Sequence, residues 1–196
     1  MFPAVLSFST RKPVFLLVIV CIAEVFSLLS FAAWPIYLVT LQTEWLLTNY
    51  QVGWISGAYF MGYVCATPFL VGITDRMDAR HVYLFSAFLG GVGCLCFAVF
   101  ATDFWTACLS WALVGAGLAG TYMPGLKALT DRLSGISRVR ATSFYTSSFG
   151  IGSALSFLIG GSIMEWLPWE MAFWIAGLCA LLALLIVTVT LENRPN

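Results

Sequence analysis

Charged residues are scarce in this sequence. Asp, Glu, Lys and Arg make up only 9% of its 196 residues, whereas 61% are hydrophobic. A water-soluble domain carries about 25% charged residues, because its surface must face water. The composition therefore excludes an ordinary soluble domain. The net charge is zero, so the chain also lacks the basic surface that nucleic-acid binding requires.

Residues that ligate metals or carry out catalysis are scarce as well. The chain has a single histidine, His81, and no Cys-x-x-Cys pair. Its six cysteines all fall within apolar stretches, where a cysteine behaves as a small buried hydrophobic residue. We therefore expect no metal site and no cofactor. An enzyme acting inside the membrane is not expected either, because no set of catalytic side chains shares one depth.

Long apolar runs, by contrast, are abundant. A helix needs about 20 apolar residues to cross a hydrocarbon core about 30 Å thick. Six such runs are separated by short polar segments, and they cover residues 14–41, 52–73, 82–101, 105–129, 141–164 and 169–191. The first run is longer than the apolar region of about 7–15 residues in a signal peptide, so we expect it to be retained. We predict an all-α membrane protein whose residues 1–196 form a single domain of six transmembrane helices.

The basic residues all lie on one side of this predicted topology. They occur in or beside the N-terminus, the loops after the second and fourth runs, and the C-terminus, at Arg11, Lys12, Arg76, Arg80, Lys127, Arg132, Arg138, Arg140 and Arg194. The opposite loops hold only acidic residues, at Glu44, Asp103, Glu165 and Glu170. An excess of Lys and Arg marks cytoplasmic loops. We predict a multi-pass protein of the cell (plasma or inner) membrane with both termini in the cytoplasm.

Small residues and one proline indicate how the helices pack. The fifth run carries a row of small residues spaced by four and therefore on one helix face, namely Ser148, Gly152, Ser156 and Gly160. Such rows let membrane helices approach closely, so we predict a contact with another helix there. In the first run, Pro35 removes a backbone hydrogen bond and is expected to kink the helix.

The loop after the second run reads Gly72-Ile-Thr-Asp75-Arg76-Met-Asp78-Ala-Arg80-His81. The pattern G-x-x-D-R-x-x-x-R at this place resembles the signature of the major facilitator superfamily, although its usual form has a glycine where Asp78 or Ala79 stands. The resemblance covers the whole chain and matches the family's N-terminal half. It implies two inverted three-helix repeats, half of a major facilitator fold. It also implies a conformational latch formed by Gly72, Asp75, Arg76 and Arg80. The alternative is that these charges only anchor the loop in water.

Glu24 is the one ionisable residue well inside a run. It follows Val14 by ten residues, which places it about 15 Å into the membrane. A charge at that depth costs at least about 2.5–3.5 kcal/mol, so such residues usually face a cavity and serve a function. Our hypothesis is that Glu24 exchanges a proton or binds a cationic substrate. The alternative is a protonated, structural glutamate that is hydrogen-bonded to another helix.

Further side chains are candidates for the wall of a central cavity. They are polar or aromatic residues of the first, second and fourth runs: Ser27, Phe31, Trp34, Tyr59, Trp111 and Tyr122. Trp111 stands four residues before Gly115, where the family pattern R-x-x-x-G would have an arginine. For each of these residues, ordinary packing is the alternative to a place in the pocket.

The resemblance implies secondary transport of a small solute by alternating access, which Glu24 would couple to protons. The expected partners are a small-molecule substrate, a proton, the lipid bilayer, and either a second six-helix half or a second copy of the chain. The alternative from another class is a non-transporting membrane subunit, or a truncated half that acts as an assembly partner.

Overall fold

The computed structural model describes residues 11–191, and of residues 11–13, 163 and 164 it describes the backbone alone. All regular structure in this part of the chain is helical. The helices are α1 (Arg11–Leu28), α2 (Ala33–Glu44), α3 (Asn49–Ile73), α4 (Ala79–Phe100), α5 (Phe104–Thr130), α6 (Gly135–Met164) and α7 (Trp169–Thr190). The predicted domain ends, residues 1–10 and 192–196 with Arg194, lie outside the described residues.

The first apolar run is divided into α1 and α2 rather than forming one continuous helix. Between them, Phe31 and Ala33 donate to carbonyl groups only three residues back, so the chain tightens into turns over residues 29–32. Pro35 has no N–H group, and its ring crowds the carbonyl four residues before it. The proline therefore accounts for the break, which is sharper than the kink that we expected.

A serine of α6 satisfies the backbone at this break. The N–H of Ala32 donates to Ser156 Oγ over 2.9 Å, and the same hydroxyl donates to the carbonyl of Leu29 over 2.8 Å. Broken helices are tolerated in membranes where a neighbouring helix supplies such partners. Ser156 belongs to the predicted row of small residues, in which Gly152 also lies against α1, next to Leu28. That row is a contact between α6 and the broken first span.

The helix starts follow local capping chemistry. Thr48 and Gln51 form a capping box at α3, and the Asp78 carboxylate accepts from the backbone of Arg80 at α4. At α5, Asp103 accepts from the backbone N–H of Thr106 over 2.8 Å, and this hydrogen bond lowers the pKa of the Asp103 carboxyl. These caps place the starts of α3 and α4 three residues, and the start of α5 one residue, before the predicted apolar runs.

Helix α6 begins earlier than the predicted span, at Gly135 rather than at residue 141. The residue Gly135 has a φ of +57°, which suits glycine, and the helix that follows includes Arg138 and Arg140. With 30 residues, α6 is about 45 Å long, whereas the hydrocarbon core is about 30 Å thick. Hydrophobicity indicates which residues can lie in lipid, but it does not indicate at which residue a helix begins or ends.

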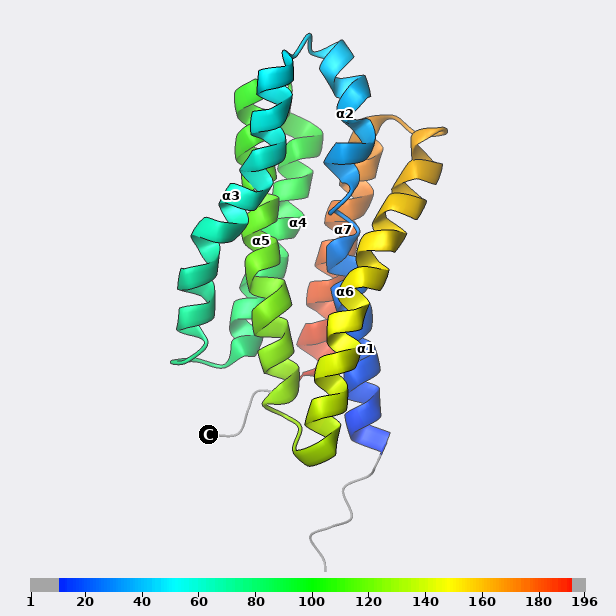
Figure 1. The fold of residues 1–196 in the computed structure, drawn as a ribbon. Coiled ribbons are helices and arrows are strands. Elements are labelled where there is room, and N and C mark those ends of the chain that lie inside the picture. Colours follow the sequence, from blue (N-terminus) through cyan, green and yellow to red (C-terminus); the bar gives the residue numbers. More distant parts are fainter. Residues whose placement is uncertain (1–10, 192–196) are drawn as a thin grey trace, which may run out of the picture.

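The helices form one elongated bundle (Figure 1). Helix α5 packs between α3 and α4, α7 lies against α4 and α1, and α6 lies against α1. The loops between α3 and α4 and between α5 and α6 lie at the lower end in Figure 1. We call this the basic end, because the described basic residues lie in or beside these loops: Arg76, Arg80, Lys127, Arg132, Arg138 and Arg140. The acidic loop residues lie at the opposite, acidic end. Both ends of the described chain lie at the basic end.

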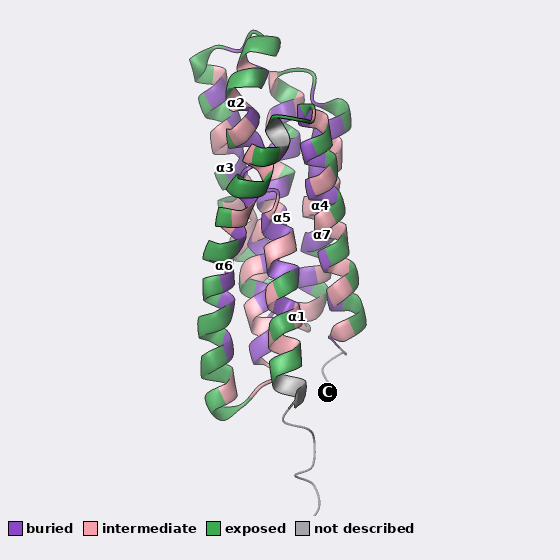
Figure 2. Ribbon diagram, turned by 90° about the vertical axis from the view of Figure 1, so that its right-hand side faces the viewer, coloured by how far each residue is buried: buried purple, intermediate pink, exposed green. Residues whose placement is uncertain are grey.

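Close backbone approaches hold the bundle together. A Cβ added to Gly62 of α3 would collide with the backbone of Ala112 in α5, and one added to Gly117 would lie 2.5 Å from the Cα of Gly90 in α4. Figure 2 shows buried residues along the inner sides of the helices and exposed residues along their outer sides. Without water to drive helices together, such close contacts supply much of the packing energy.

Five segments in the described part of the chain are long and apolar enough to cross a membrane. They are Val14–Glu44, which combines α1 and α2, and the helices α3, α4, α5 and α7. The chain is therefore a multi-pass membrane protein. Helix α6 is not among the five, and its described residues are rich in serine and threonine.

Candidate functional site

Glu24 lies fully buried in α1, with none of its surface exposed. The hydroxyl of Tyr145 in α6 donates to its Oε2 atom over 2.8 Å. Within the described residues no hydrogen-bond donor reaches the other carboxylate oxygen, Oε1, and no basic side chain forms an ion pair with Glu24. A buried carboxylate with one oxygen unpartnered is costly while it is ionised, and Oε1 is the oxygen that could carry a proton.

The Tyr145 hydroxyl lies where three helices meet. Besides Glu24 in α1, it is 3.1 Å from the carbonyl oxygen of Thr121 and 3.2 Å from that of Tyr122, both in α5. A hydroxyl donates only one hydrogen, so it can satisfy only one of these three acceptors fully at a time. A Cβ on Gly125 would collide with this hydroxyl, which shows how closely α5 encloses it.

Ser27 lies on the next turn of α1 and extends the polar cluster towards α4. Its Oγ is 3.3 Å from the hydroxyl of Tyr83, which is itself buried. Ser86, one turn further along α4, is also fully buried, and its Oγ finds no hydrogen-bond partner among the described residues. The structure therefore places Glu24, Ser27 and Tyr122 in one polar cluster that links α1, α4, α5 and α6.

Three other candidates lie in an aromatic cluster nearer the acidic end. The ring centroids of Tyr59 and Trp111 are 5.0 Å apart, and Trp34 packs against Phe97 with centroids 6.1 Å apart. The indole of Trp34 also donates to Ser56 Oγ over 2.9 Å. Trp34, Tyr59 and Trp111 are all buried, so in this arrangement they fill the core rather than line open space.

Phe31 joins the two clusters and is only half-buried. Its ring contacts Tyr59, and it also contacts Phe149 and Phe157 of α6. Phe149 in turn packs against Tyr122, with ring centroids 4.9 Å apart. Phe31, Tyr122 and Phe149 therefore form a half-buried aromatic row beside the polar cluster. A ligand that packs on this row could also contact the polar cluster.

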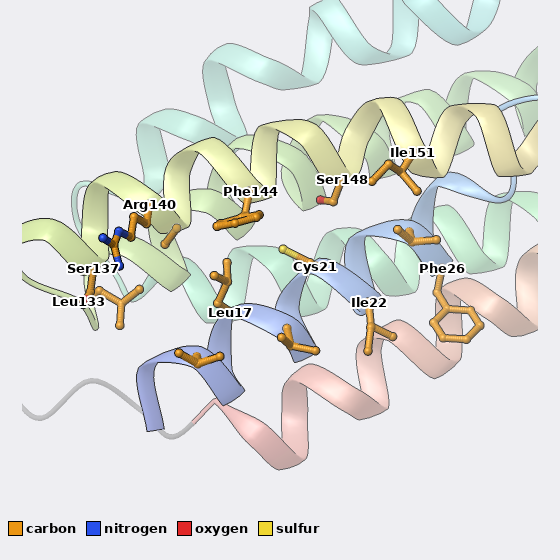
Figure 3. Close-up of a pocket in the computed structure, with 14 residues that line it drawn as sticks. Leu17, Cys21, Ile22, Phe26, Leu133, Ser137, Arg140, Phe144, Ser148 and Ile151 are labelled. Atoms are coloured by element: carbon orange, nitrogen blue, oxygen red, sulfur yellow. The ribbon is translucent and has the colours of Figure 1, made fainter. Parts of the chain in front are cut away.

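A separate cavity of about 580 Å³ lies between α1 and α6 (Figure 3). Leu17, Ile22, Phe144 and Ile151 are among its lining residues, and Glu24 is not. This cavity opens on another side of α1 and is distinct from the cluster around the buried acid.

The predicted latch residues lie at the basic end, where two of them contact other helices. The Asp75 carboxylate forms an ion pair of 2.9 Å with Lys127 of α5. The Arg80 guanidinium donates to the carbonyl of Thr188 in α7 over 2.9 Å. Arg76 is exposed, and a Cβ built on Gly72 would meet no described atom within 4 Å outside its own turn of α3. These contacts tie the α3–α4 loop to helices of the same bundle.

A second ion pair in this loop is better buried. Asp78, the N-cap of α4, pairs with Arg132 over 2.8 Å, and their side chains are only 14% and 12% exposed. Arg132 also donates to the carbonyl of Ala128 at the end of α5. This pair joins the start of α4 to the end of α5.

Sequence reasoning missed three residues that the structure places at these sites: Tyr145, Tyr83 and Arg132. A signal for Tyr145 was present, because it precedes Ser148 by three residues and so shares the helix face of the small-residue row. Tyr83 and Arg132 had no comparable signal. Their partners are 56 and 54 residues away along the chain, and only the packing of the helices brings them together.

Comparisons with known proteins agree with this architecture. A family model described as Major Facilitator Superfamily matches residues 16–196. The niacin transporter NiaP of Acinetobacter baylyi is 24% identical over 156 residues, covering 80% of this chain and 35% of that protein. The uncharacterized MFS-type transporter YcaD of Salmonella paratyphi B is 28% identical, covering 80% of this chain and 43% of that protein.

Two solved transporters share the fold. A bacterial homolog of the human lysosomal transporter Spinster superposes with a TM-score of 0.80 at 16% identity, covering 95% of this chain and 44% of that one. The human organic anion transporter MFSD10 superposes with a TM-score of 0.71 at 20% identity, covering 93% of this chain and 48% of that one. This chain thus spans less than half the length of each of these four proteins. Since the family model matches nearly all of it, the chain belongs to the Major Facilitator Superfamily, a family of transporters rather than enzymes.

Proposed function

We propose that this chain forms one six-helix half of a secondary transporter, which moves a small solute across the cell (plasma or inner) membrane by alternating access. In this proposal Glu24 takes up the coupling proton or the cationic group of the substrate. The observation that carries the proposal is the complete burial of Glu24 without a counter-ion among the described side chains. The transporters among the matched proteins support it.

The proposed topology has six transmembrane spans, with both termini in the cytoplasm. The broken pair α1–α2 is the first span, and α3 to α7 are the other five. The described Lys and Arg residues lie in or beside the loops at one end of the bundle, which supports this orientation. We include α6 as a span because it runs along α1 for much of its length and carries Tyr145 to the buried acid.

Two inverted repeats of three spans each complete the proposed half: α1–α4, in which α1 and α2 form one span, and α5–α7. Transport between two halves requires a second six-helix half, either in the same polypeptide or in a second chain such as another copy of this one. The half-buried row of Phe31, Tyr122 and Phe149 would then contact the substrate. Gly72, Asp75, Arg76 and Arg80 would form the latch against that second half.

The single hydrogen of Tyr145 suggests how Glu24 could act on the helices. While Glu24 is ionised, its charge attracts the hydroxyl hydrogen and ties α6 to α1. When a proton or a cation neutralises Glu24, that attraction weakens, and the carbonyls of Thr121 and Tyr122 compete for the same hydrogen. Neutralisation would thus loosen the α1–α6 contact and strengthen the α5–α6 contact.

The test begins with a thermal-shift screen of the purified chain in detergent, with nicotinate, organic cations and organic anions as probes. A solute that binds is then measured in proteoliposomes across a range of pH. We expect binding and uptake to depend on pH in the wild type, and Glu24→Gln to remove that dependence. Glu44→Gln, at the exposed acidic end, is the matched control and should change nothing.

A glutamine at position 24 can still accept the Tyr145 hydrogen bond, so a purely structural role predicts an unchanged pH profile. That result would overturn the proposed role of Glu24. Tyr145→Phe should shift the pH of half-maximal uptake without unfolding the protein. A chain that remains monomeric and inert with every probe would instead favour the alternative, a non-transporting subunit or an assembly partner.

A further inference from the structure

The cavity between α1 and α6 is long and almost wholly apolar. In Figure 3 it extends from Arg140 and Ser137, near the start of α6, to Phe26 and Ile151. Its volume of about 580 Å³ is in the range of ligand-binding pockets. Arg140 is the only charged residue among the described residues that line it. The cavity is therefore an apolar groove with a cation, Arg140, at one end.

The walls of this groove face outward. Val14, Val18 and Ile22 follow one stripe of α1, and they are 61%, 49% and 44% exposed. Phe144 and Ile151 project from the opposite wall, 61% and 56% exposed. At 100° per residue, Val18 and Ile22 are turned about 120° and about 160° away from Glu24, which is buried towards Tyr145. In a bilayer, these side chains face lipid rather than the polar cluster.

Helix α6 starts at the basic end (Figure 1), so Arg140, in its second turn, lies at the level where headgroups of the cytoplasmic leaflet would lie in the proposed topology. It is exposed and lies a turn and a half before Tyr145 on α6. A guanidinium at this level pairs well with a phosphate, and basic pockets between membrane helices on the cytoplasmic side bind anionic headgroups. Ser137, one turn before Arg140, adds a hydroxyl at the same end.

We propose that this groove binds an anionic phospholipid of the cytoplasmic leaflet. One acyl chain lies along Leu17, Ile22 and Phe144, and the phosphate contacts Arg140. A water-soluble solute fits poorly, because such ligands need several polar groups and, apart from Cys21 and Ser148, the groove offers them only at the end with Arg140 and Ser137. A helix of another protein also fits poorly, since close helix packing requires small residues and these walls project Phe144 and Ile151.

The test uses the purified chain, equilibrated with vesicles of phosphatidylglycerol and phosphatidylcholine in equal amounts and then examined by native mass spectrometry. We expect bound phosphatidylglycerol to exceed bound phosphatidylcholine in the wild type. Arg140→Gln should weaken phosphatidylglycerol binding about fivefold, as expected for one basic residue at a membrane surface. Arg138→Gln is the matched control, because Arg138 is exposed on the same helix but does not line the groove.

A second pair of variants tests the apolar part of the groove. Val18→Trp places a large ring in the groove and should lower retention of phosphatidylglycerol. Phe15→Trp, at an exposed position outside the lining, should not. The proposal would be overturned by any of three results. These are equal binding of both lipids, equal losses of phosphatidylglycerol binding in Arg140→Gln and Arg138→Gln, or a second protein chain bound in place of lipid. None of these outcomes depends on Glu24 or on transport.

Discussion

Two side chains of this bundle, each with more than one hydrogen-bond partner, stabilise its two irregular features. Ser156 both accepts and donates at the break between α1 and α2, and Tyr145 lies within reach of three acceptors. Both residues lie on α6, on the face that packs against the first span. One helix thus supports both irregular features of α1, namely its buried acid and its broken backbone.

Ser156→Ala should destabilise the protein by about 1 kcal/mol, because it leaves the N–H of Ala32 and the carbonyl of Leu29 without this partner. The measurement is unfolding in detergent micelles by a denaturing detergent, followed by circular dichroism. Ser162→Ala is the matched control, since Ser162 bonds only to Leu158 of its own helix and is exposed. Equal losses of stability in the two variants would show that Ser156 does not support the break.

At the scale of elements, two ion pairs fasten the loop between α3 and α4 to the rest of the bundle. They differ mainly in exposure. Asp78 and Arg132 are 14% and 12% exposed, whereas Asp75 and Lys127 are 78% and 35% exposed. Water and salt screen the second pair far more than the first.

Double-mutant cycles should separate the two pairs. We expect a coupling free energy of roughly 2 kcal/mol between Asp78 and Arg132, in the range of hydrogen bonds to charged groups, and below about 1 kcal/mol between Asp75 and Lys127. The variants are Asp78→Asn with Arg132→Gln, and Asp75→Asn with Lys127→Gln. Repeating both cycles in high salt should reduce only the second coupling noticeably. A larger coupling for the Asp75 pair would contradict this ranking.

Much of the helix content was predictable from the sequence, because an apolar run of sufficient length has few alternatives to a helix in lipid. The division of the first run at residues 29–32 was only partly predictable. Pro35 indicated a disturbance, but its extent depends on Ser156, which lies more than 120 residues away. The early start of α6 was not predictable from hydrophobicity, because Arg138 and Arg140 are polar residues within a continuing helix.

At the scale of the whole molecule, the family and the helical membrane architecture followed from the loop at Gly72–Arg80 and from the apolar runs. Glu24 was recognised in the sequence as an ionisable residue deep within an apolar run, whereas its hydrogen-bond partner Tyr145 was not identified. A lone acid in an apolar run can be recognised because its charge is costly to place in lipid. Which residue donates a hydrogen bond to it depends on how the helices are rotated about their axes. Sequence periodicity leaves that rotation undetermined among strongly apolar helices.

Labelling of engineered cysteines should establish the orientation of the whole bundle. In a background whose native cysteines are replaced by alanine, Met77→Cys and Thr102→Cys place exposed thiols at opposite ends. We expect an impermeant maleimide added to intact cells to label position 102 alone, and to label position 77 only after the membrane is opened. Labelling of both positions from one side would rule out the proposed topology.

Because α6 continues as one helix from Gly135 through Tyr145, Arg140 and the hydroxyl that holds Glu24 belong to the same stiff rod. Their separation along the axis is only about 7.5 Å. If a headgroup that binds the guanidinium displaces this part of α6, the Tyr145 hydroxyl would therefore shift with it relative to Glu24. We expect the composition of the surrounding leaflet to influence how readily the protein's interior takes up a proton.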